Sequence, residues 1–142
     1  MLENDKAAIS KLRLDNALRC IKSAKILLEE DDFKSAANRS YYAVFYAIRA
    51  VLAMDSVDFK KHSAVIAHFR KEYIKTGLFD TSYSLILSEL FEVRTDSDYD
   101  DFYILSKEDV IRQINNAEHF VKTVIFFLSE KIDLSEINKI KS

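Results

Sequence analysis

The clearest structural signal in the chain lies between Phe33 and Met54, a stretch that reads FKSAANRSYYAVFYAIRAVLAM. At 100° per residue, its apolar side chains recur every three or four positions and form one continuous face. The members of that face are Ala37, Tyr41, Val44, Ile48 and Val51. The pattern predicts a long helix that packs this face into a core.

The opposite side of the same predicted helix carries a stripe of amide, guanidinium and phenol groups. Its members are Asn38, Arg39, Tyr42, Tyr46 and Arg49. Tyrosine and arginine together can stack on bases and hold phosphates, and both are enriched at the centres of protein interfaces. A partly buried helix whose polar tips reach water would show the same pattern. We therefore treat these five residues as candidate binding residues.

Similar periodicity predicts four further helices, over residues 5–30, 59–76, 81–98 and 106–131. Asp32 and Ser106 precede helical runs and are good N-caps. Residues 55–58 offer cap residues for the third helix, and Gly77 suits the left-handed position that ends it. Because the connections are short, the sequence predicts an all-α, up-and-down bundle of four to five helices.

Composition supports one helical domain and excludes several other classes. The chain has 142 residues, no proline, one glycine and one cysteine. Strand-rich folds and phosphate-binding loops need more glycine and proline, and one cysteine makes neither a disulfide nor a cysteine zinc site. We expect one domain over residues 1–132, a short and frayed C-terminal tail over 133–142, no metal and no cofactor.

The formal net charge of −2 gives no overall attraction to nucleic acid or to an anionic membrane. The longest apolar run, residues 124–128, is far shorter than the roughly 20 residues that span a bilayer. No secretory signal opens the sequence, and a lone cysteine fits a reducing compartment. The expectation is a cytoplasmic protein without a membrane partner.

Arg94 is the sharpest anomaly, because it falls in the middle of the apolar stripe formed by Tyr83, Leu87 and Leu90. Arginine keeps its charge, so a buried one needs a partner. Asp98, one turn further on, is the nearest candidate. Arg94 is either half of a structural ion pair or a guanidinium available to a phosphate, and periodicity alone favours the pair.

The charge around Arg94 is uneven. Residues 80–109 contain nine acidic and two basic side chains, a local net charge of −7. Residues 60–62, Lys-Lys-His, open the third predicted helix. His62 is a weak candidate catalytic residue. A histidine can transfer a proton near neutral pH, but a single histidine without a recognisable partner does not indicate catalysis.

Three segments together resemble one family. They are residues 36–47 (AANRSYYAVFYA), 61–63 (KHS) and 94–100 (RTDSDYD). In this order they are similar to the HEPN family, the higher eukaryote and prokaryote nucleotide-binding domain, and especially to its small stand-alone prokaryotic members. The resemblance implies a bundle of four or five helices, homodimers, and frequent pairing with a minimal nucleotidyltransferase in toxin–antitoxin modules.

Many toxins of that family are metal-independent ribonucleases whose signature is an arginine followed four to six residues later by a histidine. Arg94 matches the arginine, but Asp98, Tyr99 and Asp100 occupy the histidine window. An aspartate with an ordinary pKa near 4 is a poor base, and clustered carboxylates repel RNA phosphates.

The leading hypothesis is therefore a non-catalytic or weakly active HEPN module that dimerises and binds a nucleotide, RNA or a nucleotidyltransferase partner. The surface assigned to this role comprises Arg39, Tyr42, Tyr46, Arg94, Asp98 and Tyr99. One alternative is an endoribonuclease toxin in which Arg94 works with a substitute base. Another is a purely structural bundle in which Arg94 and Asp98 form an internal tie.

Overall fold

The computed structural model describes residues 3–99, 104–135 and 137, with the side chains of residues 3, 4 and 96–99 left out of the description. Its helices are α1 (Glu3–Glu29), α2 (Phe33–Met54), α3 (His62–Phe69), α4 (Ser82–Tyr99) and α5 (Lys107–Ser129). A π-helical turn, η1 (Arg70–Ile74), continues α3. No strand occurs in these ranges, and the predicted all-α class is confirmed.

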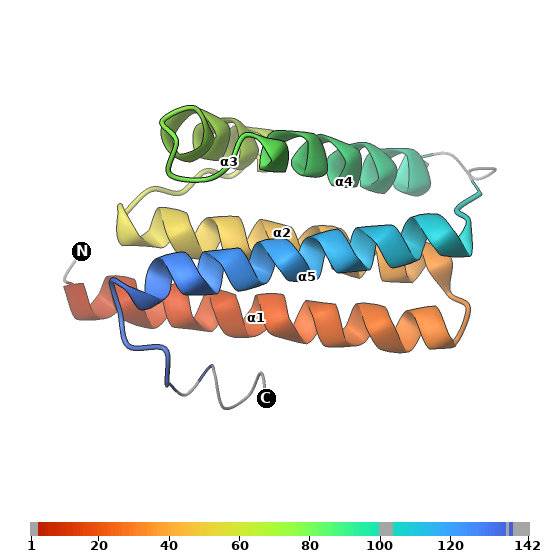
Figure 1. Ribbon diagram of the computed structural model, residues 1–142, viewed down its shortest axis with the longest axis horizontal. Helices are drawn as coiled ribbons and strands as arrows, with labels where there is room; N and C mark the ends of the chain where they lie inside the picture. Colours follow the sequence, from red (N-terminus) through yellow and green to blue (C-terminus); the bar gives the residue numbers. More distant parts are fainter. Residues whose placement is uncertain (1–2, 100–103, 136, 138–142) are drawn as a thin grey trace.

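The helices form two layers (Figure 1). One layer contains α1, α2 and α5 side by side, and the other contains α3, η1 and α4 above α2 and α5. Successive long helices α1, α2, α4 and α5 alternate in direction, which is the expected up-and-down arrangement. α2 contacts α1, α3, α4 and α5, so it is the central helix of the bundle.

Burial along α2 follows from its composition. Only Lys34 is exposed in its 22 residues, and Ile48 and Leu52 have no accessible surface. Removing a side chain of that size from water stabilises the fold by about 1.5–3 kcal/mol. The helix begins where the side chain of Asp32 accepts a hydrogen bond from the backbone N–H of Ser35, at 3.2 Å. The predicted N-cap at Asp32 is confirmed.

Two other predicted helix boundaries are also confirmed. The hydroxyl of Ser106 accepts a hydrogen bond from the backbone N–H of Asp109 at 3.1 Å, and this cap begins α5. Gly77 has φ +88°, a left-handed conformation that follows the end of η1.

The predicted start of the third helix is wrong. α3 begins at His62 instead of Phe59, and Lys61 at its N-cap makes no side-chain capping bond. Asp58, expected among the cap residues, instead binds Arg13 and Arg49. This shift places the first turn of α3, with His62, beside α2.

Part of the predicted tail packs onto the bundle. Leu134 and Ile137 are 3% and 5% exposed and join the main hydrophobic core, whereas residues 136 and 138–142 lie outside the described part. Cys20 is buried, as expected for a small apolar residue. Within the described ranges, no helix is long and apolar enough to cross a membrane.

Candidate functional site

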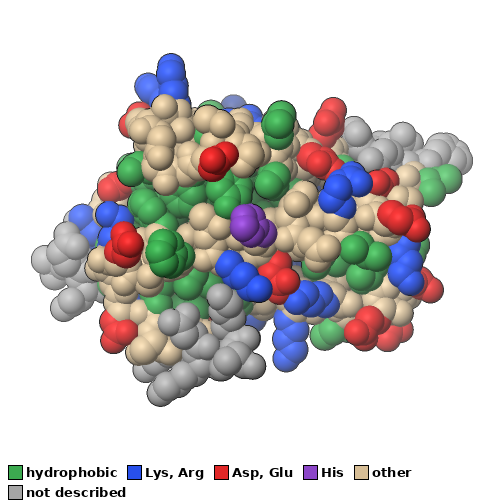
Figure 2. All heavy atoms as spheres, in the orientation of Figure 1, with side chains coloured by type: hydrophobic (Ala, Val, Ile, Leu, Met, Phe, Trp, Pro, Cys, Tyr) green, Lys and Arg blue, Asp and Glu red, His purple; other side chains and the backbone are tan. Residues whose placement is uncertain are grey.

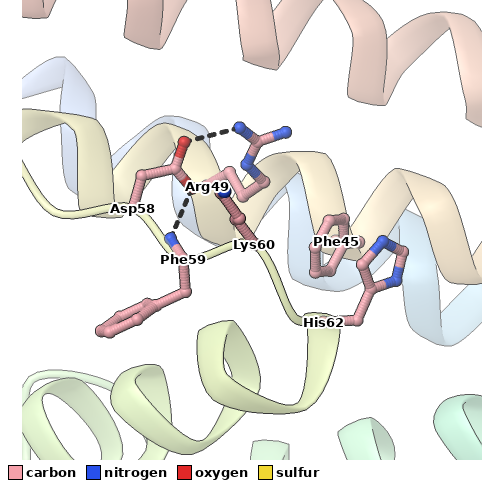
Figure 3. Close-up of a pocket in the computed structure, with 6 residues that line it drawn as sticks. All are labelled: Phe45, Arg49, Asp58, Phe59, Lys60 and His62. Atoms are coloured by element: carbon pink, nitrogen blue, oxygen red, sulfur yellow. Dashed lines mark hydrogen bonds and ion pairs between the residues drawn. The ribbon is translucent and has the colours of Figure 1, made fainter.

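The site begins with a hydrogen bond between α2 and α3. Tyr41 is 3% exposed, and its hydroxyl lies 3.0 Å from Nδ1 of His62. The imidazole of His62 stacks on the ring of Phe45 with a centroid separation of 4.0 Å (Figure 3). His62 is therefore held against α2 by a hydrogen bond and by ring contacts.

Arg94 reaches the same tyrosines from α4. Its guanidinium carbon lies 5.1 Å from the ring centroid of Tyr41 and 5.6 Å from that of Tyr42. Its Nη2 donates a hydrogen bond to the hydroxyl of Tyr42 at 3.3 Å. The ring of His62 lies 5.8 Å from that of Tyr42, edge to face. Arg94 and His62, 32 positions apart in the sequence, thus flank one pair of tyrosines.

The rest of the predicted stripe extends from Tyr42. The guanidinium of Arg39 lies 5.1 Å from the Tyr42 ring centroid and donates to Oδ1 of Asn38 at 2.8 Å. The ring of Tyr46 is 6.4 Å from that of Tyr42. These side chains are half-buried, so they are neither core nor ordinary solvent face. They line one continuous aromatic and cationic surface.

A cavity of about 360 Å³ lies beside His62. Arg49 donates to Asp58 at 2.8 Å, and Arg13 of α1 donates to the same carboxylate oxygen at 3.3 Å. Figure 3 shows Asp58 turned toward Arg49, with Lys60 beside them. The cavity is lined by Phe45, Arg49, Asp58, Phe59, Lys60 and His62.

The surroundings shift the pKa of both hydrogen-bonded groups. Burial lowers the pKa of His62 below its ordinary 6.5, and the positive charges of Arg94 and Arg49 lower it further. Burial raises the pKa of Tyr41 to about 12, with Arg94 opposing the shift and Tyr42 adding to it. At neutral pH, His62 is therefore an uncharged imidazole and Tyr41 an uncharged phenol.

This pair also determines the position of the imidazole proton. Within the described part of the chain, the Tyr41 hydroxyl makes its one hydrogen bond to Nδ1 of His62. A buried hydroxyl that has no acceptor for its proton costs the fold about 1–3 kcal/mol of stability. Tyr41 therefore donates the hydrogen bond, and Nδ1 of His62 accepts it. The imidazole proton is then on Nε2. His62 consequently presents an N–H donor from Nε2.

Among the described side chains, those that meet the aromatic rings of α2 are mainly cationic. α2 contains no Asp or Glu, and Arg39, Arg49 and Arg94 converge on its aromatic rings. Of the acidic residues between 80 and 109, Glu89 and Asp109 are both bound by Arg112 of α5. Figure 2 shows the face that carries α5, where acidic and basic side chains are interspersed.

Two predicted site residues lie partly outside the description. The backbone of Asp98 and Tyr99 belongs to α4, but their side chains are not among those described. The predicted ion pair between Arg94 and Asp98 is therefore not tested. Among the described residues, no group of three or more His, Cys, Asp or Glu side chains could hold a metal ion.

Sequence reasoning missed several residues of the site. Tyr41 was assigned to the core face, although its hydroxyl in an apolar stripe signals a hidden polar partner. Phe45 was not among the candidate binding residues, and Asp58 was placed among the cap residues. Phe59 and Lys60 were read as part of the third helix, but they precede it and line the cavity.

The fold and the site define a small helical bundle with an aromatic and cationic face on its central helix. The sequence model of the HEPN domain matches residues 10–132. The chain belongs to the HEPN family.

Relatives of nearly the same length support this assignment. A "UPF0332 protein" of Thermotoga maritima is 35% identical, over 85% of this chain and 92% of the relative. Methanocaldococcus jannaschii has "Putative toxin MJ0142", 29% identical over 96% of this chain and 93% of the relative. "Putative toxin MJ0605" of the same organism is 32% identical, over 56% of this chain and 59% of the relative. The chain is thus a HEPN module with relatives named as toxins.

Proposed function

We propose that this HEPN module binds a phosphate group of RNA or of a nucleotide at the site between Arg94 and His62, and that it does so without cutting the RNA. The observation that carries the proposal is that these two residues, from α4 and α3, flank the same pair of tyrosines on α2. An arginine and an imidazole N–H are both phosphate donors.

The surrounding groups match the rest of such a ligand. Tyr42 and Tyr46 are half-buried, and a base can stack on aromatic rings whatever its identity. Arg39 adds a second guanidinium at the Tyr42 ring. Because α2 carries no carboxylate, a bound anion meets no repulsion from the helix that forms the floor of the site.

The alternative function is RNA cleavage, with His62 replacing the histidine that is missing after Arg94. Its support is the same proximity, together with a pKa low enough to keep His62 uncharged. As a base, however, His62 would have to offer a bare Nε2. That tautomer carries its proton on Nδ1 and leaves the Tyr41 hydroxyl without its acceptor. Binding without cleavage is therefore our preferred function.

The proposal includes the oligomeric state and the partner. We expect a homodimer and association with a minimal nucleotidyltransferase, as the two halves of a toxin–antitoxin pair. The support is membership of the HEPN family and the names of the toxin relatives. Light scattering after size exclusion, with and without co-expression of a nucleotidyltransferase encoded beside this chain, tests both points. A monomer that retains no partner would contradict them.

Binding is tested by fluorescence anisotropy with a labelled single-stranded RNA and by calorimetry with ATP. Arg94→Ala should weaken binding at least tenfold, since a lost charge-assisted contact is worth about 1.5–3 kcal/mol. Arg112→Ala is the matched control, because Arg112 pairs with Glu89 on the α4–α5 side. Equal affinities for the wild type and Arg94→Ala, or no binding by either, would overturn the proposal.

Incubation of the same RNA distinguishes binding from cleavage. We expect intact RNA after long incubation and no growth defect on expression. Cleavage that disappears in both Arg94→Ala and His62→Ala would establish the alternative instead.

A further inference from the structure

The cavity beside His62 is lined by other residues than the Arg94 site, but the two share His62. His62 hydrogen-bonds Tyr41 and, together with the Phe45 ring on which it stacks, lines the cavity. At about 360 Å³ the cavity falls in the range of small-ligand sites, about 300–1,000 Å³. A ligand bound at Arg94 can therefore extend past His62 into a second site.

The charges of this cavity favour an anion. Asp58 contributes one negative charge, but Arg13 and Arg49 both bind it. Lys60 adds a third positive charge and is exposed. The cluster is thus net positive, and Lys60 is the cation best able to reach a ligand.

An aromatic ring completes the second site. Phe59 is 39% exposed, and one neighbour of its ring is His68 at 5.3 Å. A ring that is supported on one side and open on another can accept a stacked base. Figure 3 shows Phe59 and His62 extending from the two ends of the same short segment, with Lys60 between them.

We infer that this cavity binds the nucleotide adjacent to the phosphate held at Arg94 and His62, so that the ligand is a single-stranded RNA of at least two nucleotides and not a free mononucleotide. Phe59 stacks on the base and Lys60 contacts the second phosphate. This inference rests on the proposed function, because the first phosphate must bind at Arg94.

The test compares an adenosine monophosphate with a five-nucleotide RNA in calorimetric titrations. The wild type should bind the RNA about tenfold or more tighter than the mononucleotide, the gain expected from one stacked base and one phosphate contact. Phe59→Ala and Lys60→Ala should each weaken RNA binding about three- to tenfold and leave mononucleotide binding unchanged. Both side chains are at least partly exposed, so the fold should tolerate the changes.

The controls are Phe126→Ala and Lys122→Ala, two exposed residues of α5 outside the cavity. They should bind both ligands like the wild type. If Phe59→Ala and Lys60→Ala bind the RNA as tightly as these controls, the second site is refuted, whereas mononucleotide binding that depends on Arg94 leaves the proposed function intact. If Arg94→Ala changes neither titration, the proposed function itself fails.

Discussion

The hydroxyl of Tyr41 lies 3.0 Å from Nδ1 of His62, and this bond joins the central helix α2 to the first turn of α3. It fixes the tautomer of the histidine and holds its ring beside Arg94. Through this bond a residue of the core face of α2 controls which atom His62 presents to a ligand.

Removal of the Tyr41 hydroxyl should weaken the fold and release the histidine tautomer. Tyr41→Phe keeps the ring contacts and should lower the free energy of unfolding by about 1 kcal/mol, measured by urea denaturation. Tyr46→Phe is the control, because the Tyr46 hydroxyl makes no hydrogen bond within the described residues. Equal stability of the two variants would show that the bond between Tyr41 and His62 contributes nothing.

His62 should make stability depend on pH. Burial, then Arg94 and Arg49, depress its pKa in the fold, with Tyr41 and Tyr42 as its other polar neighbours. Between that depressed value and the ordinary 6.5, the unfolded chain binds more protons at this position. The free energy of unfolding should therefore fall as the pH drops below 6.5. In His62→Phe, the free energy of unfolding should depend less steeply on pH in this range. An unchanged dependence would contradict the lowered pKa of His62.

The helix end at Gly77 gives a prediction independent of the site. Gly77 has φ +88°, and a Cβ added there would meet no heavy atom within 4 Å. Gly77→Ala should therefore destabilise the protein by backbone strain alone, about 1 kcal/mol, as thermal unfolding will show. Gly77→Asn should be milder, because asparagine tolerates the left-handed region. If the two variants lose the same amount of stability, the loss does not come from the left-handed backbone conformation at residue 77.

Gln113 on α5 gives a prediction in the opposite direction. It is 1% exposed, and neither its amide nitrogen nor its amide oxygen has a hydrogen-bond partner within the described residues. Gln113→Met removes two unsatisfied polar atoms at similar volume and should raise the free energy of unfolding by about 1 kcal/mol. Gln113→Glu should lower it, and a loss of stability in the Met variant would argue that an ordered water satisfies the amide.

Much of the fold follows from local sequence rules. The caps at Asp32 and Ser106 and the left-handed Gly77 depend on neighbours within a few residues, so the sequence predicted them. The start of α3 did not follow, because Asp58 lies where it could cap a helix but forms ion pairs with Arg13 and Arg49 instead. Those partners are 45 and 9 positions away in the sequence.

The site was predicted only in part, because some of its contacts join residues that are distant in the sequence. The angular positions of residues around each single helix identified the stripe containing Tyr42 on α2, and they showed that Arg94 lies in the apolar face of α4. They could not show that α4 turns Arg94 toward Tyr42, or that α3 brings His62 to Tyr41, because such contacts depend on how helices pack. The local charge of −7 could not be assigned to partners from the sequence either, since Arg112 from outside that stretch binds two of its members, Glu89 and Asp109.

The most direct test of the central claim is the pKa of His62, measured by NMR on protein labelled with ¹⁵N at histidine, with and without a five-nucleotide RNA. The account predicts a proton on Nε2 in the free protein, a pKa below 6.5 and a higher pKa in the complex, because a phosphate beside Nε2 favours the charged imidazole. If neither the pKa of His62 nor the ¹⁵N chemical shift of its Nε2 changes at saturating RNA, the phosphate does not bind between Arg94 and His62.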